Sequence, residues 1–291
     1  MKKLGWFTVG FTYLLMTWGN MVSATGSGFG CPDWPRCHGT FFPPATFETI
    51  LEWGHRLLAA TTTLLIVATI ALILRSRGKY GRALKSSGRF LLAMLAVQIV
   101  LGGFTVLLGL SVVVSTIHLV IANLVMGGLI TVASVMTWGD PVVTQSVKMR
   151  RLAVSGLMGL LIQLALGALV RHSHSGLACP MFPGCLEGFW PIPLTFGTAV
   201  AFTHRWWGII MFGLYFHLLS VSIRKSKPLR MACAIAFALA CTQIILGIST
   251  VLGGLGTASR GLHAAGGYAL WAMTFYISIR SGSFRYLYGR S

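Results

Sequence analysis

The chain has 291 residues, of which 55% are hydrophobic and only 10% are charged. Because soluble domains carry about 25% charged residues, this composition excludes a water-soluble globular protein, and its apolar content excludes a disordered one. The 23 lysines and arginines outnumber the 5 acidic residues and give a net charge of +18. They do not cluster in one segment, as a nucleic-acid-binding face would require. The sequence therefore predicts a polytopic membrane protein with no nucleic-acid partner.

Long apolar runs follow one another along the chain. A run of about 18 or more apolar residues predicts a transmembrane helix. The expected spans are Gly5–Ala24, Ile50–Leu74, Phe90–Leu110, Val112–Trp138, Leu152–Val170, Ala199–Ile223, Met231–Leu252 and Leu262–Ile279. The first run follows two lysines, but it is too long for the apolar part of a signal peptide and is followed by a poor cleavage site. We therefore expect eight spans.

The basic residues predict the orientation of these spans, because lysine and arginine favour cytoplasmic connections. One set of connections carries 18 of them: Lys2, Lys3, Arg75, Arg77, Lys79, Arg82, Lys85, Arg89, Lys148, Arg150, Arg151, Arg224, Lys225, Lys227, Arg230, Arg280, Arg285 and Arg290. The opposite side holds only Arg36, Arg56, Arg171, Arg205 and Arg260. We expect a multi-pass protein of the cell (cytoplasmic) membrane, with both termini in the cytoplasm.

The chain contains an internal duplication. The segment QIVLGGFTVLLG at 98–109 reappears at 243–254 as QIILGISTVLGG, with eight of twelve positions identical. Cysteine and histidine residues recur at offsets of 145 to 149. The predicted fold is all-α, with two four-helix bundles, residues 1–140 and 141–291. As parallel repeats, the bundles would be related by a pseudo-two-fold axis along the membrane normal.

Two pairs of cysteines lie in the two long outer loops. Cys31 and Cys37, like Cys179 and Cys185, have five residues between them. The outer side of a bacterial membrane is oxidising, so we expect the disulfides Cys31–Cys37 and Cys179–Cys185. A redox-active pair, inert thiols and a zinc site are the alternatives, although the tight ligand spacing that zinc prefers is absent.

Four histidines open the even-numbered spans near the outer side: His55, His118, His204 and His263. Polar residues within spans usually face a bundle interior and have a function there. Two imidazoles that face each other across a four-helix bundle form a bis-histidine haem site. We expect one iron site from His55 and His118 and another from His204 and His263. Zinc or copper would need further ligands, and each single histidine has packing as its alternative role.

Charged residues beside these histidines differ between the halves. Glu52 lies three residues before His55 and therefore on the same helix face, whereas the equivalent position before His204 is Ala201. A carboxylate there could accept protons or stabilise positive charge during oxidation; an interfacial charge is the alternative. Arg56 and Arg205 each follow a histidine. Each is predicted either to bind a haem propionate or to anchor the helix at the membrane surface.

Several segments together resemble one family. These are ATGSGFGCPDWPRCHG (24–39), ILEWGHRLLA (50–59), His118, FTHRWWG (202–208) and GLHAAGGY (261–268). They are similar to the haem A synthases, membrane enzymes that convert haem O to haem A for terminal oxidases. The resemblance implies that His55 and His118 bind the substrate haem O, and that His204 and His263 bind a resident haem B. It also implies that Glu52 is an essential carboxylate and that Cys31 and Cys37 form the outer-loop pair.

The same resemblance implies partners and a reaction. The expected partners are haem O, membrane lipid, a haem O synthase, an unidentified electron acceptor and further copies of the chain. The reaction would oxidise a porphyrin methyl group to a formyl group through hydroxylated intermediates. If both histidines stay bound, the substrate iron has no open position for dioxygen. Either one histidine dissociates, or electrons leave the macrocycle and water supplies the oxygen.

Two other functions compete with this interpretation. A di-haem b-type electron-transfer protein linked to quinone explains the histidines but not why Glu52 occurs in one half alone. A transporter fits the parallel repeats, but it predicts broken helices and polar groups at the midplane. The polar residues of this chain instead gather near the outer side.

Overall fold

The structure is a computed structural model that describes residues 2–76, 81–139, 142–144 and 146–284. These residues form a short 3₁₀ helix, Ser27–Phe29, and eight α-helices. The α-helices are α1 (Lys2–Ala24), α2 (Phe47–Arg75), α3 (Arg82–Leu107), α4 (Val112–Trp138), α5 (Val147–His172), α6 (Phe196–Ser222), α7 (Lys227–Leu252) and α8 (Thr257–Arg280). In the described part of the chain, β pairing is limited to one bridge between Cys37 and Thr40.

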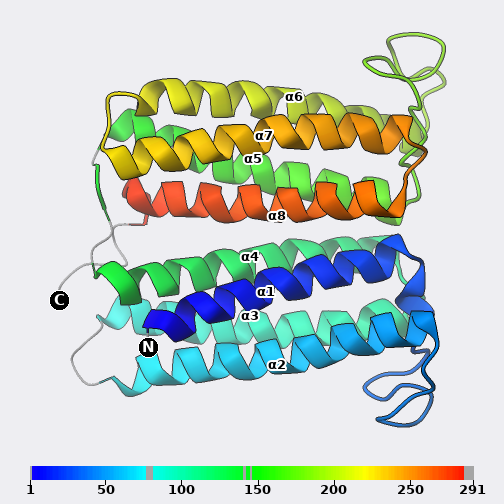
Figure 1. The fold of residues 1–291 in the computed structure, drawn as a ribbon, viewed down its shortest axis with the longest axis horizontal. Coiled ribbons are helices and arrows are strands. Elements are labelled where there is room, and N and C mark those ends of the chain that lie inside the picture. Colours follow the sequence, from blue (N-terminus) through cyan, green and yellow to red (C-terminus); the bar gives the residue numbers. More distant parts are fainter. Residues whose placement is uncertain (1, 77–80, 140–141, 145, 285–291) are drawn as a thin grey trace.

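The helices run side by side in two groups of four, α1 to α4 and α5 to α8 (Figure 1). The two groups meet through α1 and α4 on one side and α5 and α8 on the other. Helix α1 begins and α8 ends at the same end of the molecule, and the two long loops project from the opposite end (Figure 1). An even number of helices in each group places equivalent elements in the same direction, as the predicted parallel repeat requires.

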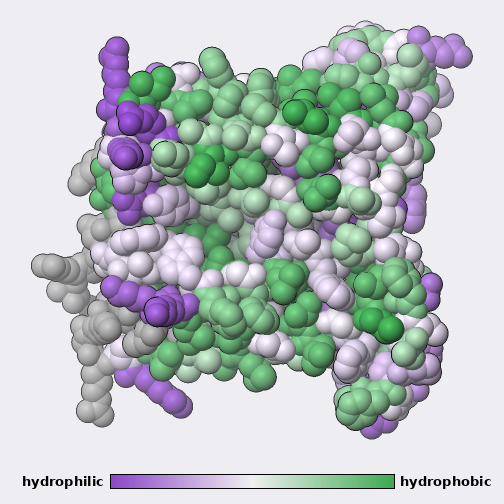
Figure 2. All heavy atoms as spheres, viewed as in Figure 1, coloured by the Kyte–Doolittle hydropathy of each residue, from purple (hydrophilic) through white to green (hydrophobic). Residues whose placement is uncertain are grey.

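Five of the eight helices, α2, α3, α4, α5 and α7, are long and apolar enough to cross a membrane on length and composition alone. The other three have 23, 27 and 24 residues and lie alongside them. Their sequences contain more tryptophan, tyrosine, histidine and glycine, which lower the mean hydropathy of a span. Hydrophobic side chains cover much of the visible face between the two ends (Figure 2). The chain is thus an all-α membrane protein.

The helix ends differ from the predicted ends where capping or charge extends a helix beyond its apolar run. Helix α2 begins three residues before the expected Ile50, because Oγ1 of Thr46 accepts a hydrogen bond from the Thr49 backbone N–H. Helix α3 begins at Arg82, eight residues before the expected Phe90. The basic residues Lys85 and Arg89, which we expected in a connection, therefore lie on the first turns of a helix. Arg77, Lys79, Arg285 and Arg290 lie outside the described residues.

The very short connection between α3 and α4 is a tight turn that recurs between α7 and α8. Gly109 and Leu110 have φ values of 64° and 56°, and the equivalent Gly254 and Leu255 have 65° and 61°. Such left-handed conformations favour glycine. The N–H of Leu110 donates to the carbonyl of Thr105, and that of Leu255 donates to the carbonyl of Thr250. The duplication therefore extends to the hydrogen bonds of the turns.

Helix α4 contributes to both hydrophobic cores. One core packs α2, α3 and α4 around residues such as Ile70 and Leu129. The other joins α4 to the second group of helices around Trp271 and Tyr215. Nε1 of Trp271 also donates to the carbonyl of Asn123 on α4, at 2.7 Å. The second core and the Trp271–Asn123 hydrogen bond hold the two groups together.

Candidate functional site

The four predicted iron-ligating histidines lie about two turns into α2, α4, α6 and α8, and each ring packs against a glycine of the preceding helix. A methyl group added at Gly19 would lie 2.6 Å from Cε1 of His55, and one at Gly167 would lie 3.0 Å from Cε1 of His204. At Gly102 and Gly247 the corresponding distances to His118 and His263 are both 3.3 Å. Each glycine therefore provides the space that its imidazole occupies.

The glycines themselves obey the sequence repeat. Gly19 and Gly167 are 148 positions apart, and Gly102 and Gly247 are 145 apart. Gly102 and Gly247 lie within the duplicated segment, but residue type alone gives these four glycines no predicted role. The repeat offset, applied to glycines as well as to histidines, would have revealed them. Glycine at these positions is explained by the close approach of a side chain, without any unusual backbone angle.

Each of the four rings also has a buried nitrogen without a protein partner. Nδ1 of His55, His118, His204 and His263 is buried and accepts or donates no hydrogen bond among the described residues. The amide nitrogen of Gln98 lies 3.2 Å from Nε2 of His118. Buried polar atoms are normally hydrogen-bonded, so unsatisfied imidazole nitrogens at all four equivalent positions indicate that the sites are built for a further ligand.

In the second group of helices the two histidines line a common cavity. The cavity has a volume of about 250 Å³ and is lined by His204, His263 and mostly apolar side chains. The ring centroids of His204 and His263 are 6.4 Å apart. Because metal–imidazole bonds are about 2 Å long, two imidazoles on opposite sides of one metal ion have centroids about 6 Å apart. This spacing fits one iron held between the two rings.

The donor set distinguishes a haem from a metal ion bound by protein alone. Among the residues that the structure describes, no three or more histidine, cysteine, aspartate or glutamate side chains come together as a possible metal cluster. A metal ion bound only by side chains usually needs three or four of them. A porphyrin supplies four nitrogens of its own, so a haem needs only two imidazoles. The residues present therefore fit haem.

The first group of helices carries a buried carboxylate on the same helix as His55. Glu52 on α2 has only 6% of its surface exposed, and its Oε1 accepts a hydrogen bond from Nε of Arg56 at 2.9 Å. This is the one ion pair between side chains found in the described ranges. Burying a carboxylate is costly unless it is paired, and Arg56 provides the pairing.

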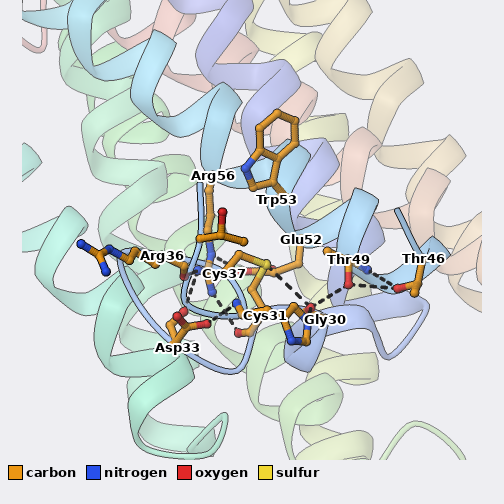
Figure 3. The surroundings of a disulfide bond; sticks show 12 residues. Gly30, Cys31, Asp33, Arg36, Cys37, Thr46, Thr49, Glu52, Trp53 and Arg56 are labelled. Carbon is orange, nitrogen blue, oxygen red and sulfur yellow. Dashed lines mark hydrogen bonds and ion pairs between the residues drawn. A yellow bond between two sulfur atoms is a disulfide. The ribbon is translucent and has the colours of Figure 1, made fainter. Parts of the chain in front are cut away.

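The guanidinium of Arg56 also holds the first outer loop (Figure 3). Nη1 donates to the carbonyls of Asp33 and Arg36, both at 2.7 Å, and Nη2 donates to the carbonyl of Cys31 at 3.1 Å. Arg56 therefore connects the Glu52 carboxylate to the backbone of the loop that Cys31 and Cys37 close. The sequence did not reveal this contact, and a contact between Arg56 and a haem propionate stays a prediction.

Arg205 makes the equivalent contacts with the second outer loop. Nη1 donates to the carbonyls of Met181 and Gly184, and Nη2 donates to the carbonyl of Cys179 at 2.8 Å. These three acceptors are 148 positions after Cys31, Asp33 and Arg36. Each of the three carbonyls that Arg56 binds therefore has an equivalent carbonyl that Arg205 binds. The carboxylate has no equivalent, because position 201 is alanine. A propionate contact of Arg205 also stays a prediction.

Both predicted disulfides are confirmed. Cys31 is bonded to Cys37 and Cys179 to Cys185, which makes inert thiols and a zinc site wrong as alternatives. All four sulfur-bearing residues are buried. Each disulfide closes the short loop segment whose carbonyls an arginine holds.

Asp33 stabilises the turn inside the first loop. Its two carboxylate oxygens accept hydrogen bonds from the backbone N–H groups of His38 at 2.6 Å and Gly39 at 2.9 Å. These hydrogen bonds, that from Gly39 above all, hold the pKa of the Asp33 carboxyl below its usual value. The turn is therefore stabilised while Asp33 is ionised and loses this contribution as the pH falls through that lowered pKa.

Comparisons with known proteins place the chain in a family. The model of the cytochrome oxidase assembly protein family matches residues 2–51 and 44–275. The chain belongs to this family. A Heme A synthase of Bacillus pumilus is 28% identical, over 97% of this chain and 92% of its own length. The Heme A synthases of Bacillus mycoides and Bacillus licheniformis are each 29% identical, over 89% and 73% of this chain and 86% and 72% of their own lengths.

Membership of the cytochrome oxidase assembly protein family agrees with the resemblance found in the sequence. The matched residues include the first outer loop, all four histidines and Glu52. The duplicated glycines, arginines and disulfides therefore belong to a scaffold that spans the whole matched region. Around the histidines, the two groups differ in side chains such as Glu52 and its counterpart Ala201.

Proposed function

We propose that this membrane protein is a haem A synthase, which oxidises a porphyrin methyl group of haem O to the formyl group of haem A. The observation that carries the proposal is the buried Glu52 carboxylate, three residues before His55, whose counterpart before His204 is Ala201. Family membership and the names of the relatives support the same reaction. Conversion of the methyl group with one water molecule to a formyl group releases four protons and four electrons. A site for this reaction needs a proton acceptor and a route for electrons.

In this proposal the first group of helices, within residues 1–140, holds the substrate. His55 and His118 bind the iron of haem O, and Gly19 and Gly102 provide the space for their rings. Glu52 lies on the same face of α2 as His55. It accepts protons released from the methyl group or stabilises positive charge that develops on the macrocycle. Arg56 keeps the carboxylate in position.

The second group, within residues 141–291, holds a resident haem B between His204 and His263. When bound, this haem supplies one-electron transfer. Ala201 leaves that site without a carboxylate, so its residues bind and orient the haem but do not accept protons from a substrate. We further propose that the termini lie in the cytoplasm of the cell (cytoplasmic) membrane, because most basic residues belong to that side. A haem O synthase, an electron acceptor and further copies of the chain are proposed partners.

A di-haem electron carrier that acts on quinone is the competing function. It requires two haem sites of the same kind and gives no reason to bury a carboxylate in one of them. The second group forms the equivalent arginine-to-loop contacts with alanine at position 201, so those contacts do not require a carboxylate. The carboxylate therefore favours the synthase.

The experiment replaces the carboxylate in one half and changes the matched position in the other. We expect Glu52→Ala to lower haem A formation by at least about 100-fold, because proton transfer is lost, while the bound haem content is retained. Ala201→Ser, a small change at the equivalent position, should alter turnover far less than Glu52→Ala. The products are measured by acid extraction and mass analysis of the pigments. Loss of haem from Glu52→Ala would show that Glu52 is structural, and unchanged product would contradict the proposal.

A further inference from the structure

Side chains at equivalent positions around the two sites carry different charges. In the first group of helices, Glu52 and Arg56 form an ion pair whose net charge is zero. In the second group, Ala201 replaces the carboxylate, and Arg205 donates only to backbone carbonyls. Carbonyl groups satisfy hydrogen bonds but do not neutralise a charge. The guanidinium of Arg205 therefore remains a cation without a carboxylate partner in the described part of the chain.

A second cation, Arg171, has no counterpart in the first group. Position 171 is equivalent to position 23, where the first group has serine. Arg171 and Ser23 meet between the two groups, where Nε of Arg171 donates to Oγ of Ser23 at 3.0 Å. Nη1 and Nη2 donate to the side-chain and backbone oxygens of Asn20. All these acceptors are neutral, so the charge of Arg171 is also uncompensated by any carboxylate among the described residues.

Both uncompensated arginines line the cavity of His204 and His263. The rest of its lining is largely apolar, with side chains such as Leu164, Phe212 and Ile244. Charges act more strongly in such surroundings than in water, because the local dielectric constant is low. Two cations therefore act on whatever lies between the two histidines, whereas the equivalent charged positions of the first group form a neutral pair.

We propose that Arg171 and Arg205 raise the reduction potential of an iron porphyrin bound by His204 and His263 above that of one bound by His55 and His118. This inference rests on the proposed function for the identity of the bound groups. Reduction of ferric to ferrous iron removes one positive charge, so neighbouring cations favour the reduced form. With iron porphyrins bound at both sites, His55 and His118 would hold the electron donor, which would lose one electron, and His204 and His263 would hold the acceptor, which would gain it. No bond is made or broken and no proton moves.

The consequence is a direction for electron flow that is built into the duplicated scaffold. The half with the carboxylate releases electrons and protons, and the half with the uncompensated cations accepts the electrons. The ligands, glycines and loop contacts are the same in both halves and cannot by themselves set this direction. Among the positions that line the cavity of His204 and His263 and their equivalents in the first group, those that differ in charge are 171 and 23, and 201 and 52.

The test is a redox titration of the full-length purified protein, followed by the visible absorption of the haem that His204 and His263 bind. Arg171→Gln should lower its midpoint potential without changing the bis-histidine spectrum. Arg171→Lys keeps the charge and should leave the potential near that of the wild type. Arg36→Gln removes an exposed outer arginine that does not line the cavity and should have no effect.

Because Arg171 also connects α1 to α5, a second variant keeps the test decisive if Arg171→Gln loses haem. Ala201→Glu recreates in the second group the carboxylate that the first group pairs with arginine, and it should lower the midpoint potential. Ala201→Gln, similar in size and uncharged, should not. An unchanged potential in haem-containing Ala201→Glu and Arg171→Gln would overturn the inference. Failure of the wild type to bind haem would instead overturn the proposed function, before any titration.

Discussion

The two groups of four helices share a scaffold and differ in the charges placed on it. Equivalent glycines make space for equivalent histidines, and equivalent arginines hold equivalent disulfide-closed loops by the same three backbone carbonyls. The carboxylate occurs only in the first group, and Arg171 occurs only in the second. Equivalent positions therefore give the histidines the same surroundings of glycine and loop in both groups, while the charged side chains near them differ.

A methyl group added at Gly19, against the ring of His55, should produce the largest difference in haem binding between the two sites. Gly19→Ala places Cβ 2.6 Å from Cε1 of His55, and overpacking of this kind costs about 1–3 kcal/mol. We expect binding of haem by the first group to weaken by roughly 10- to 100-fold, while haem bound by His204 and His263 stays. Spectroscopic haem titration measures both.

Two glycines serve as controls for this substitution. A methyl group at Gly10, also on α1, meets no atom within 4 Å, so Gly10→Ala should leave both sites intact. Gly167→Ala, with a distance of 3.0 Å to His204, should weaken only the second site. If Gly19→Ala lost haem equally from both sites, Gly19 would not provide space for the ring of His55 alone.

Removal of the disulfide Cys31–Cys37 should produce a smaller difference between the two groups of helices. Without the Cys31–Cys37 bond, the carbonyls that Arg56 binds are less ordered, so the guanidinium holds the Glu52 carboxylate less firmly. We expect Cys31→Ser with Cys37→Ser to lower turnover roughly tenfold, about 1.4 kcal/mol, with the haem of the second group retained. The measurement is haem A formed per haem bound.

The second disulfide is the matched control for the first. Cys179→Ser with Cys185→Ser loosens the loop that Arg205 holds, where there is no carboxylate to position. Its effect should appear in the haem content of the second group, while turnover per remaining haem changes less than in the first double variant. If both pairs of substitutions changed turnover equally, Arg56 would not act as a positioning residue for Glu52.

Much of this arrangement could be predicted from the sequence, because it depends on periodic or repeated features. Long apolar runs predicted the all-α fold, and repeated cysteine and histidine residues predicted the disulfides and the pairing of His204 with His263. The first turns of α2 and α3 could not be found from hydropathy, because Thr46 caps one helix and basic residues begin the other. The roles of Arg56 and Arg205 depend on backbone carbonyls, which a sequence pattern does not encode.

We propose that the first group of helices oxidises its haem and that the second retains one. The most direct measurement is the haem composition of the purified protein, obtained by acid extraction and mass analysis of the wild type, His55→Ala and His204→Ala. The wild type should contain haem B together with haem O, a hydroxylated intermediate or haem A. His55→Ala should lose haem O, the hydroxylated intermediate and haem A but keep haem B. His204→Ala should lose haem B. Haem B alone, at two per chain in the wild type, or retention of haem B in His204→Ala, would contradict the account.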